Sequence, residues 1–386
     1  MKIIELVNQK TKKAFFDVAR SIYKNDENWT CPLDIELDAI FDKEENTCFR
    51  DGEAIRWVLM DDKNKPIGRI AAFIDRKKAN TFEQPTGGTG FFECINNQDA
   101  ANLLFDTAKK WLQERGMEAM DGPINFGENY MNWGLLVDGF MHQGYGMQYH
   151  HPYYKNLFEN YGFKVFFSQY SYHLNPMEFP IDRFKRITEW SLQRGGFSYK
   201  QFNFSDIEKF VDDFIIIFNT VWQSFKEDYT PLDKADIKKI FNSAKPIIDT
   251  RLVWFAYHND KPIAMITMFP DVHQIFKKLN GKLHLLNKLK FAWLKWRKTI
   301  NRTRVLMLGV VPEFQKAGLE AGLITNVHYV FAKGDYTEIE ISWVGDFNNK
   351  MRKMAESINA KQVKTHNTYR YLFDRNKEFK RYPMGV

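Results

Sequence analysis

The stretch VLMLGVVPEFQKAGLEAGLITNVHYVF, residues 305–331, decides how this 386-residue chain folds. Its first residues are almost all apolar and predict a buried strand that ends near Val311. Pro312 has no backbone N–H to donate, and residues 315–318 lead into a helix that we expect to continue to about Lys333. A turn that opens a helix presents unpaired N–H groups at the positive end of the helix dipole. The stretch therefore predicts either an anion site, most naturally for phosphates, or an ordinary strand-to-helix connection.

The chain contains two copies of one pattern. IRWVLMDDKNKPIGRIAAFID, from residue 55, and LVWFAYHNDKPIAMITMFPD, from residue 252, each consist of a strand, a polar turn ending in Lys-Pro-Ile and a second strand. Trp57 and Trp254 in these segments are 197 residues apart, and Glu159 and Glu356, far downstream, have the same spacing. Two separated matches at one spacing indicate a duplicated domain.

Each copy carries its own insertion. Between the two matches the copies align only if Gly116 is placed opposite Gly334, 218 residues later. The second copy has therefore gained the segment of about 274–304 before this point, and the first has gained about 126–151 after it. Residues 173–182, which two prolines interrupt, are the predicted linker. We expect two domains, 1–178 and 179–386, with specific function placed in the insertions.

The order of elements within one copy predicts the fold class. A strand and helices come first, followed by a hairpin, a strand that leads into a helix, another strand, a helix and a last strand. Strand-rich runs that alternate with helices indicate an α/β fold, or an α+β fold with a mixed sheet. We therefore expect two tandem domains, each with a mixed central sheet flanked by helices.

The positive charge of the chain is concentrated in the second insertion. The formal net charge is +7, but no acidic residue lies between Asp271 and Glu313. Ten basic residues lie in this interval: Lys277, Lys278, Lys282, Lys288, Lys290, Lys295, Arg297, Lys298, Arg302 and Arg304. Such a local excess favours an acidic partner that binds at this segment over a surface that coats nucleic acid generally.

The same segment predicts an amphipathic helix. Leu286, Leu289, Trp293, Trp296 and Ile300 recur at helical spacing among the lysines. In one interpretation this apolar face packs on the protein's own core and the basic side is solvated. In the other it binds an anionic membrane surface, an acyl carrier protein or RNA.

Other features argue against several classes of protein. Three widely spaced cysteines fit neither a disulfide framework nor a zinc ribbon, and His142, His150 and His151 lack the paired spacing of a zinc site, so we expect no metal. The apolar segments are too short for the roughly 20 residues of a membrane span. No export signal is visible near the start, and we expect a cytoplasmic protein. PTGGTGFF, residues 85–92, lacks the Lys-Ser/Thr of a phosphate loop and is predicted to be a flexible hairpin loop.

The elements after residue 331 extend the opening pattern into a resemblance. They are the strand EIEISW, an Asn-containing turn and the helix of NNKMRKMAESINAK. The whole order resembles the GNAT superfamily of acyl-CoA N-acyltransferases, whose V-x-P and Gln-x-x-Gly pattern falls on VVPEFQKAGL. The resemblance implies acetyl-CoA or another acyl-CoA as co-substrate. It places the cofactor on Leu308, Gly309, Val310, Val311, Gln315, Lys316, Ala317, Gly318, Leu319 and Asn348.

The resemblance also implies a reaction, the attack of an amine on a thioester carbonyl. A backbone N–H near residues 308–310 would stabilise the oxyanion, and the cleft between the domains would hold a small-molecule or peptide amine. Alternation in EIEISW puts Glu338, Glu340 and Ser342 on one face of the strand. Glu340 is the candidate base, directly or through water, although a carboxylate at a solvated sheet edge has the same pattern. The candidate substrate-binding residues are Ser342, Trp343 and Asp346.

Departures from the family pattern keep other functions open. Glu320 stands where the family has a small residue, and Ala355 and Phe158 stand where it often has the tyrosine that acts as general acid. The corresponding turn of the first copy, ECINNQDAAN, has no glycine, which indicates a degenerate copy. One alternative is a ligand-binding tandem protein without activity. Another is a carrier-linked acyl or aminoacyl transferase, similar in architecture to the Fem-type enzymes, that docks through the basic segment.

Overall fold

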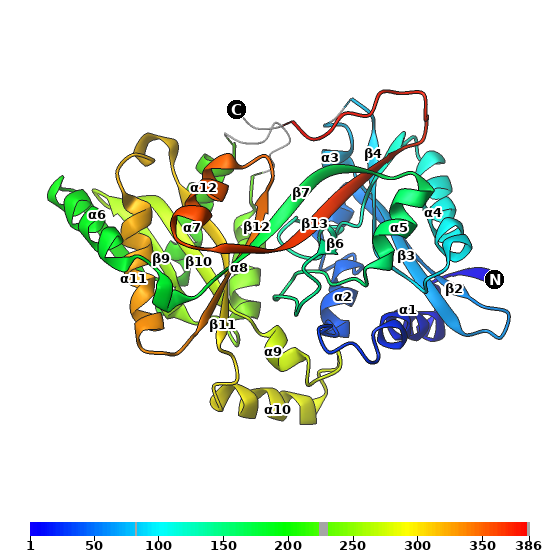
Figure 1. Ribbon diagram of the computed structural model, residues 1–386, viewed down its shortest axis with the longest axis horizontal. Helices are drawn as coiled ribbons and strands as arrows, with labels where there is room; N and C mark the ends of the chain where they lie inside the picture. Colours follow the sequence, from blue (N-terminus) through cyan, green and yellow to red (C-terminus); the bar gives the residue numbers. More distant parts are fainter. Residues whose placement is uncertain (82, 224–230, 384–386) are drawn as a thin grey trace.

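The computed structural model describes residues 1–81, 83–223 and 231–383, and its central feature is a mixed sheet that runs through both halves of the chain (Figure 1). The strands of the first half are β1 (Lys2–Glu5), β2 (Gly52–Met60), β3 (Pro66–Asp75), β4 (Thr86–Cys94), β5 (Ala119–Gly122), β6 (Leu135–Asp138) and β7 (Lys164–Leu174). Its helices are α1 (Gln9–Ile22), α2 (Asp34–Ile40), α3 (Arg76–Ala79), α4 (Gln98–Gln113) and α5 (Tyr153–Tyr161).

The second half repeats this order with additional helices. Its strands are β8 (Phe197–Gln201), β9 (Val253–His258), β10 (Lys261–Pro270), β11 (Arg302–Val310), β12 (Glu338–Gly345) and β13 (Lys361–Leu372). Its helices are α6 (Ile181–Gln193), α7 (Ile207–Gln223), α8 (Lys234–Ala244), α9 (His273–Phe276), α10 (Leu285–Trp296), α11 (Leu319–Ala332) and α12 (Asn349–Ser357). In the part of the chain that the structure describes, none of these helices is long and apolar enough to cross a membrane.

The two halves exchange their last strands. The strand order is β1-β2-β3-β4-β5-β13-β7-β12-β11-β10-β9-β8, and β6 pairs with β13. β7 of the first half pairs with β12, whereas β13 of the second half pairs with β5, and Figure 1 shows the two long strands crossing between the halves. The division into 1–178 and 179–386 stays a prediction. Each of these ranges contributes one strand, β7 or β13, to the other half of the sheet.

The duplicated pattern and the mixed α/β architecture are confirmed. Trp57 lies opposite Ile70 in the β2–β3 hairpin, and Trp254 lies opposite Ile266 in the β9–β10 hairpin. Gly116 follows α4 and Gly334 follows α11, and both have positive φ, 80° and 74°. A residue in this left-handed conformation is a common way to end a helix, and glycine adopts it without strain. The alignment of these two glycines therefore reflects a shared structural position.

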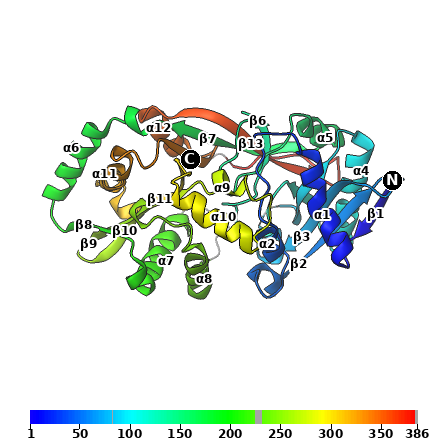
Figure 2. The same ribbon diagram turned by 90° about the horizontal axis from the view of Figure 1, so that it is seen from below.

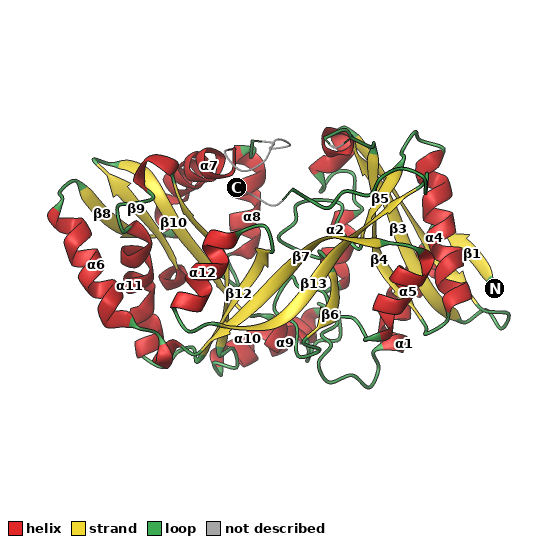
Figure 3. Cartoon of the chain, turned by 45° about the horizontal axis from the view of Figure 1, so that its top comes forward, coloured by secondary structure: helices red, strands yellow, loops and turns green. Residues whose placement is uncertain are grey.

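Helices cover both faces of the sheet. In the first half Ile70 and Ala72 of β3 pack in one core with α4 and α5, while Ala71 between them packs in a second core with α1 and α2. In the second half α6, α11 and α12 lie on one face and α7 and α8 on the other, as the view from below shows (Figure 2). Figure 3 shows the same layers around the long central strands.

The prediction of a flexible hairpin loop at residues 85–92 is wrong. These residues form most of β4, a buried strand in the middle of the first half. A Cβ on Gly88 would lie 2.0 Å from the Phe73 ring, and a Cβ on Gly90 would lie 1.9 Å from the Ile124 carbonyl oxygen. The glycines therefore allow neighbouring groups to approach the strand closely, which is one of the positional uses of glycine inside a sheet.

Candidate active site

The two strands that carry most of the predicted site pair only at their beginnings. β11 and β12 are parallel, and their paired positions run from Arg302 opposite Glu338 to Val305 opposite Ile341. Beyond these positions β11 continues along β10, and β12 continues along β7. The strands therefore part inside the sheet, next to the residues predicted to hold the cofactor.

The parted segment of β11 directs backbone donors away from β10. The N–H of Val311 donates to the Ile263 carbonyl of β10 at 2.9 Å. Because alternate N–H groups of a strand point to opposite sides, those of Leu308 and Val310 are directed toward β12. These are two of the groups that the sequence predicted near a reacting carbonyl. A Cβ on Gly309 would point to the sheet face that α7 covers, where it would meet the Trp222 ring at 3.1 Å.

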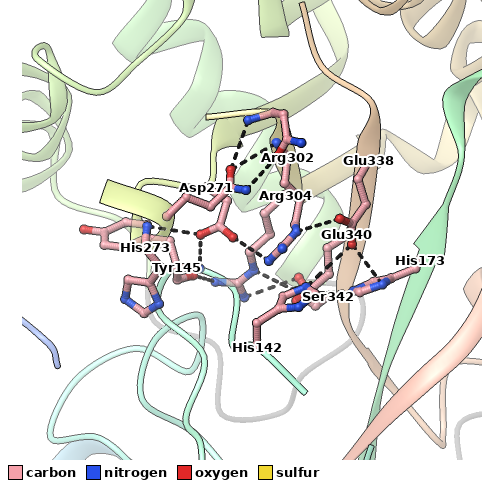
Figure 4. A network of polar contacts seen from close by, with 12 residues as sticks. His142, Tyr145, His173, Asp271, His273, Arg302, Arg304, Glu338, Glu340 and Ser342 are labelled. Carbon is pink, nitrogen blue, oxygen red and sulfur yellow. Dashed lines mark hydrogen bonds and ion pairs between the residues drawn. The ribbon is translucent and has the colours of Figure 1, made fainter. Parts of the chain in front are cut away.

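One face of the paired segment is polar and buried (Figure 4). Glu340 is completely buried; its carboxylate accepts from Lys364 Nζ of β13 at 2.7 Å and lies 3.1 Å from His173 Nε2 of β7. His173 Nδ1 lies 3.0 Å from Glu338 Oε1, so one imidazole joins the two carboxylates. Arg302 adds a further ion pair to Glu338 at 3.0 Å. The predicted solvated sheet edge is therefore wrong for Glu340, which lies in an interior network.

The charges in this network set its protonation. Burial by itself raises the pKa of the Glu340 carboxyl, but Lys364 and His173 outweigh burial and hold this pKa well below its usual range. Burial lowers the pKa of His173, and the two carboxylates more than compensate, so its pKa is raised. A carboxylate in contact with cationic donors favours this pattern of charge. We therefore describe Glu340 as ionised at neutral pH.

The insertion of the first half closes the polar face. The Tyr145 N–H donates to Asp271 Oδ1 at 2.9 Å, and Asp271 also binds Arg302 at 2.8 Å. A Cβ on Gly144 would lie 2.8 Å from Glu340 Oε1, a buried oxygen that has no hydrogen-bond partner among the described residues. The side chain of Arg304 binds Ser342 Oγ at 2.8 Å and backbone carbonyls of the insertion. Residues of both halves therefore build one site.

The other face of the same strands is apolar. Ile339 and Ile341 alternate with the carboxylates along β12 and, with Val305 and Leu308 of β11, line a seam under α11 and α12. The seam is narrow, with a cavity volume of about 60 Å³, so a ligand would have to part its side chains. The helices contribute Ile324, Val327, His328, Phe331, Met351 and Met354, and the remaining lining comes from β7, β10, the segment after β7 and Ile358.

The turn before α11 has the predicted form. Gly318 is the residue before the helix, with φ of 74°, and no side chain of the described residues caps the helix start. A Cβ on Gly318 would lie 2.8 Å from Ile187 of α6, so this glycine is required both by its φ and by helix packing. Lys316 is exposed beside it, whereas Ala317 and Leu319 are buried. Glu320 is partly buried, and burial raises the pKa of its carboxyl.

The remaining predicted residues have local structural partners. Asn348 caps α12, because its side chain accepts from the Met351 N–H at 3.1 Å. Trp343 Nε1 donates to the Asn129 carbonyl of the first insertion at 2.7 Å. Asp346 is buried and binds Arg381 at 2.7 Å. The role of these residues toward a ligand stays a prediction.

A second set of side chains comes together that the sequence did not predict. His142, His173 and Glu338 each offer a ligand atom within 4.8 Å of the others, a donor set that could hold a divalent cation. The imidazoles of His142 and His173 are stacked with centroids 5.7 Å apart. Spacing along the chain gave no sign of this set, because its members come from three separate segments. The sequence did contain one sign of a buried polar network. Arg302 and Arg304 alternate at the start of RTRVLMLGV, which is otherwise almost entirely apolar.

No protein-family model matches the chain. A protein named bacterial ceramide synthase, from Caulobacter vibrioides (strain NA1000 / CB15N), is 28% identical over 96% of this chain and 97% of its own length. A tandem GNAT protein from the clavulanic acid biosynthesis pathway superimposes with a TM-score of 0.55 at 9% identity, over 97% of this chain and 99% of that one. The chain has the tandem GNAT fold.

A further solved structure supports the same fold. A GCN5-related glucosamine N-acetyltransferase region of a fungal multi-domain β-N-acetylglucosaminidase superimposes with a TM-score of 0.58 at 11% identity. The match covers 96% of this chain, but this chain spans only 38% of that longer protein. At such low identity the likeness concerns the tandem GNAT fold alone.

Proposed function

We propose that this protein is an N-acyltransferase that joins the acyl group of a long-chain acyl-CoA to the amine of an amphipathic amino alcohol. The observation that carries the proposal is the contrast across β11 and β12. An apolar seam lies on one face of these strands and a buried polar network on the other, next to the point where they part. A hydrocarbon chain and a reacting amine require these two environments, and ceramide, the product in the relative's name, is an N-acylated long-chain amino alcohol.

The donor thioester would enter where the strands part. The pyrophosphate would lie at the uncapped start of α11, beside the exposed Lys316, since backbone N–H groups and a cation favour an anion there. The carbonyl oxygen would accept from the N–H groups of Leu308 or Val310. The acyl chain would part the seam lined by Val305 and Ile341, which is more apolar than acetyl requires. We therefore favour a long acyl group over the acetyl group that the GNAT resemblance suggests.

The reaction is acyl transfer without a covalent enzyme intermediate. The amine nitrogen attacks the thioester carbonyl, the C–N bond forms, and the C–S bond breaks as the tetrahedral intermediate collapses. One proton leaves the nitrogen and one proton is taken up by the thiolate, so the products are an amide and free coenzyme A. Attack makes the nitrogen strongly acidic, and a weak base then suffices to accept its proton.

Glu340 remains our candidate for that base. Its low pKa suits a proton that becomes acidic only after attack, and its oxygen Oε1 has no partner among the described residues. The carboxylate is buried under Gly144, so the proton would reach it through water or through His173. Lys364 would act as a positioning residue that keeps Glu340 ionised.

An acyl-transfer assay tests the proposal. Purified protein is incubated with acetyl-CoA or palmitoyl-CoA and a long-chain 2-amino-1,3-diol, and amide product and free thiol are measured. We expect the N-palmitoyl product and little N-acetyl product. Equal use of both donors would contradict the long-chain assignment, and no amide from a folded protein that binds acyl-CoA would favour the non-catalytic alternative.

A matched pair of charge reversals tests the placement of the cofactor. Lys316→Glu puts a negative charge beside the proposed pyrophosphate, whereas Lys333→Glu makes the same change at the other end of α11, where the side chain is also exposed. We expect Lys316→Glu to raise the KM for acyl-CoA about tenfold and Lys333→Glu to leave it unchanged. Equal effects of the two substitutions would contradict a phosphate site at this turn.

A further inference from the structure

The apolar face of α10 is not covered by any of the residues that the structure describes. Leu285, Leu286, Leu289, Trp293 and Trp296 are exposed, with 53% to 79% of each residue's surface accessible. The interpretation that this face packs on the protein's own core is therefore wrong for the leucines and tryptophans. Only Ile300, beyond the helix end, packs against buried side chains.

α10 is attached to the protein by a different stripe. Leu294 is buried and Phe291 partly buried in a small core that also contains Leu33 of the first half and Ile275 of α9. The side-chain amide of Asn287 donates to the Leu279 and Lys282 carbonyls at 3.1 and 2.7 Å. At 100° per residue, positions 287, 291 and 294 lie opposite positions 285, 289 and 296. The helix is therefore fixed on its inner side and presents large apolar side chains on its outer side.

Basic residues flank the exposed stripe. Lys288 and Lys295 lie on one side of it and Lys290 on the other, and Lys282 and Arg297 follow at the two ends of the helix. Within the described residues, none of these five forms an ion pair with a carboxylate; in this segment Lys298 and Arg302 do. Figure 2 shows α10 lying flat across the surface that faces the viewer. An apolar stripe bordered by unneutralised lysines is the pattern of a helix that lies in a membrane interface.

We propose that α10 docks this protein on an anionic lipid bilayer, with the stripe of Leu285, Leu286, Leu289, Trp293 and Trp296 in the interface and the lysines at the headgroups. Charge complementarity favours an anionic partner, because seven lysines and arginines lie between residues 277 and 297 without an acidic residue among them. RNA or an acidic protein would be bound mainly through these charges and would leave five large apolar side chains in water. Membrane docking does not rest on the proposed function, because it needs no catalysis.

Vesicle binding tests this proposal with the full chain. The protein is sedimented with vesicles of phosphatidylcholine alone and with vesicles of equal parts phosphatidylcholine and phosphatidylglycerol. We expect strong binding to the mixed vesicles, weaker binding to the neutral ones, and a decrease as salt is raised. No binding to the mixed vesicles would overturn the proposal. In the wild-type chain, tryptophan quenching by brominated lipid provides a second readout that depends on no substitution.

Substitutions on two helices give the matched control. Trp293→Ala with Trp296→Ala removes the aromatic part of the stripe, whereas Trp190→Ala removes a similarly exposed tryptophan from α6. We expect the double variant to bind mixed vesicles at least about tenfold more weakly and Trp190→Ala to bind like the wild type. Unchanged binding by the double variant would overturn the proposal, and circular dichroism checks that each variant is folded.

Two other occupants give distinguishable results. If a second copy covers the stripe, light scattering will show a dimer that the double variant abolishes, and the wild type will not bind vesicles. If RNA is the partner, an RNA oligonucleotide will bind in a salt-sensitive manner that Lys288→Glu weakens and the tryptophan substitutions do not. Either result without vesicle binding overturns membrane docking.

Discussion

Each half of the sheet contains one pair of parallel strands, β4–β5 in the first half and β11–β12 in the second. The halves differ in what lies beyond the paired part of these strands. In the first half the chain fills the gap there, because the Ile124 N–H donates to the Thr89 carbonyl at 2.9 Å and Gly90 leaves room for the Ile124 carbonyl. In the second half β11 and β12 part, and among the described residues no backbone hydrogen bond joins residues 307–310 to the segment after β12. In this part of the fold the chain fills the gap in one copy, whereas the two strands part in the other.

The first turns of α4 and α11 also differ between the two halves. In the first half the Asn97 side chain accepts from the Ala100 N–H at 2.8 Å and so satisfies the start of α4. In the second half Gly318 precedes α11, which has no side-chain cap among the described residues. A capped start has fewer N–H groups to offer an anion than an uncapped one. We therefore expect that the first half has a supporting role and that the second copy carries the ligand.

Glu340→Gln should have the largest effect. It removes the charge that pairs with the buried Lys364, and leaving a buried charge unpaired costs roughly 3–5 kcal/mol. The proposed role predicts, in addition, about 100-fold slower turnover by the protein that remains folded. Glu93→Gln is the matched control, because Glu93 forms a buried pair with Arg69 in the first half. Denaturant unfolding and acyl transfer are measured; a similar loss of turnover in Glu93→Gln would remove the distinction between the halves.

A buried histidine in β13, one of the two exchanged strands, should make the free energy of unfolding depend on pH. Burial lowers the pKa of His366 in β13 to about 4, while its Nε2 lies 2.9 Å from the Gln148 carbonyl. Below pH 6.5 the unfolded chain binds this proton more readily than the folded chain, so stability present above pH 6.5 is lost as the pH falls toward 4. The maximum loss is about 3 kcal/mol. His366→Gln, which copies Gln169 at the corresponding position of β7, should reduce the slope of the unfolding free energy against pH; an unchanged slope would contradict this assignment.

Gly90→Ala should destabilise the closed first half. Its Cβ would lie 1.9 Å from the Ile124 carbonyl oxygen, so the backbone must move, at a cost of about 2 kcal/mol. Gly309→Ala is the counterpart on β11, where the nearest atom is 3.1 Å away on the Trp222 side chain, and should cost less than about 1 kcal/mol. Thermal and denaturant unfolding measure both substitutions. Equal costs would mean that the segment containing Ile124 adapts more easily than its contacts indicate.

Asn97→Ala should have a smaller effect than Glu340→Gln, His366→Gln or Gly90→Ala. Removing the cap of α4 should cost about 1 kcal/mol of unfolding free energy and leave the KM for acyl-CoA unchanged. A shift of this KM comparable to that in Lys316→Glu would show that the first helix start also contributes to the ligand site. The same unfolding and acyl-transfer measurements decide between these results.

Local features were predictable because neighbours in the chain set them. The strand, turn and helix of residues 305–331 follow from hydrophobic periodicity, a proline and a glycine. The alternation of Glu338, Ile339, Glu340 and Ile341 also follows from strand geometry, and the structure confirms that the two pairs occupy opposite faces. The repeat predicted the tandem arrangement, because related segments form related elements.

The sequence thus determined by itself the α/β fold class, the duplicated pattern and the turn before α11. Only the tertiary structure decided that the last strands are exchanged, that Glu340 meets Lys364 and His173, and that the apolar stripe of α10 is exposed. The physical reason is that secondary structure depends on spacing within a few residues. Burial, by contrast, depends on partners that are far apart along the chain, such as His173 and Glu340, 167 residues apart.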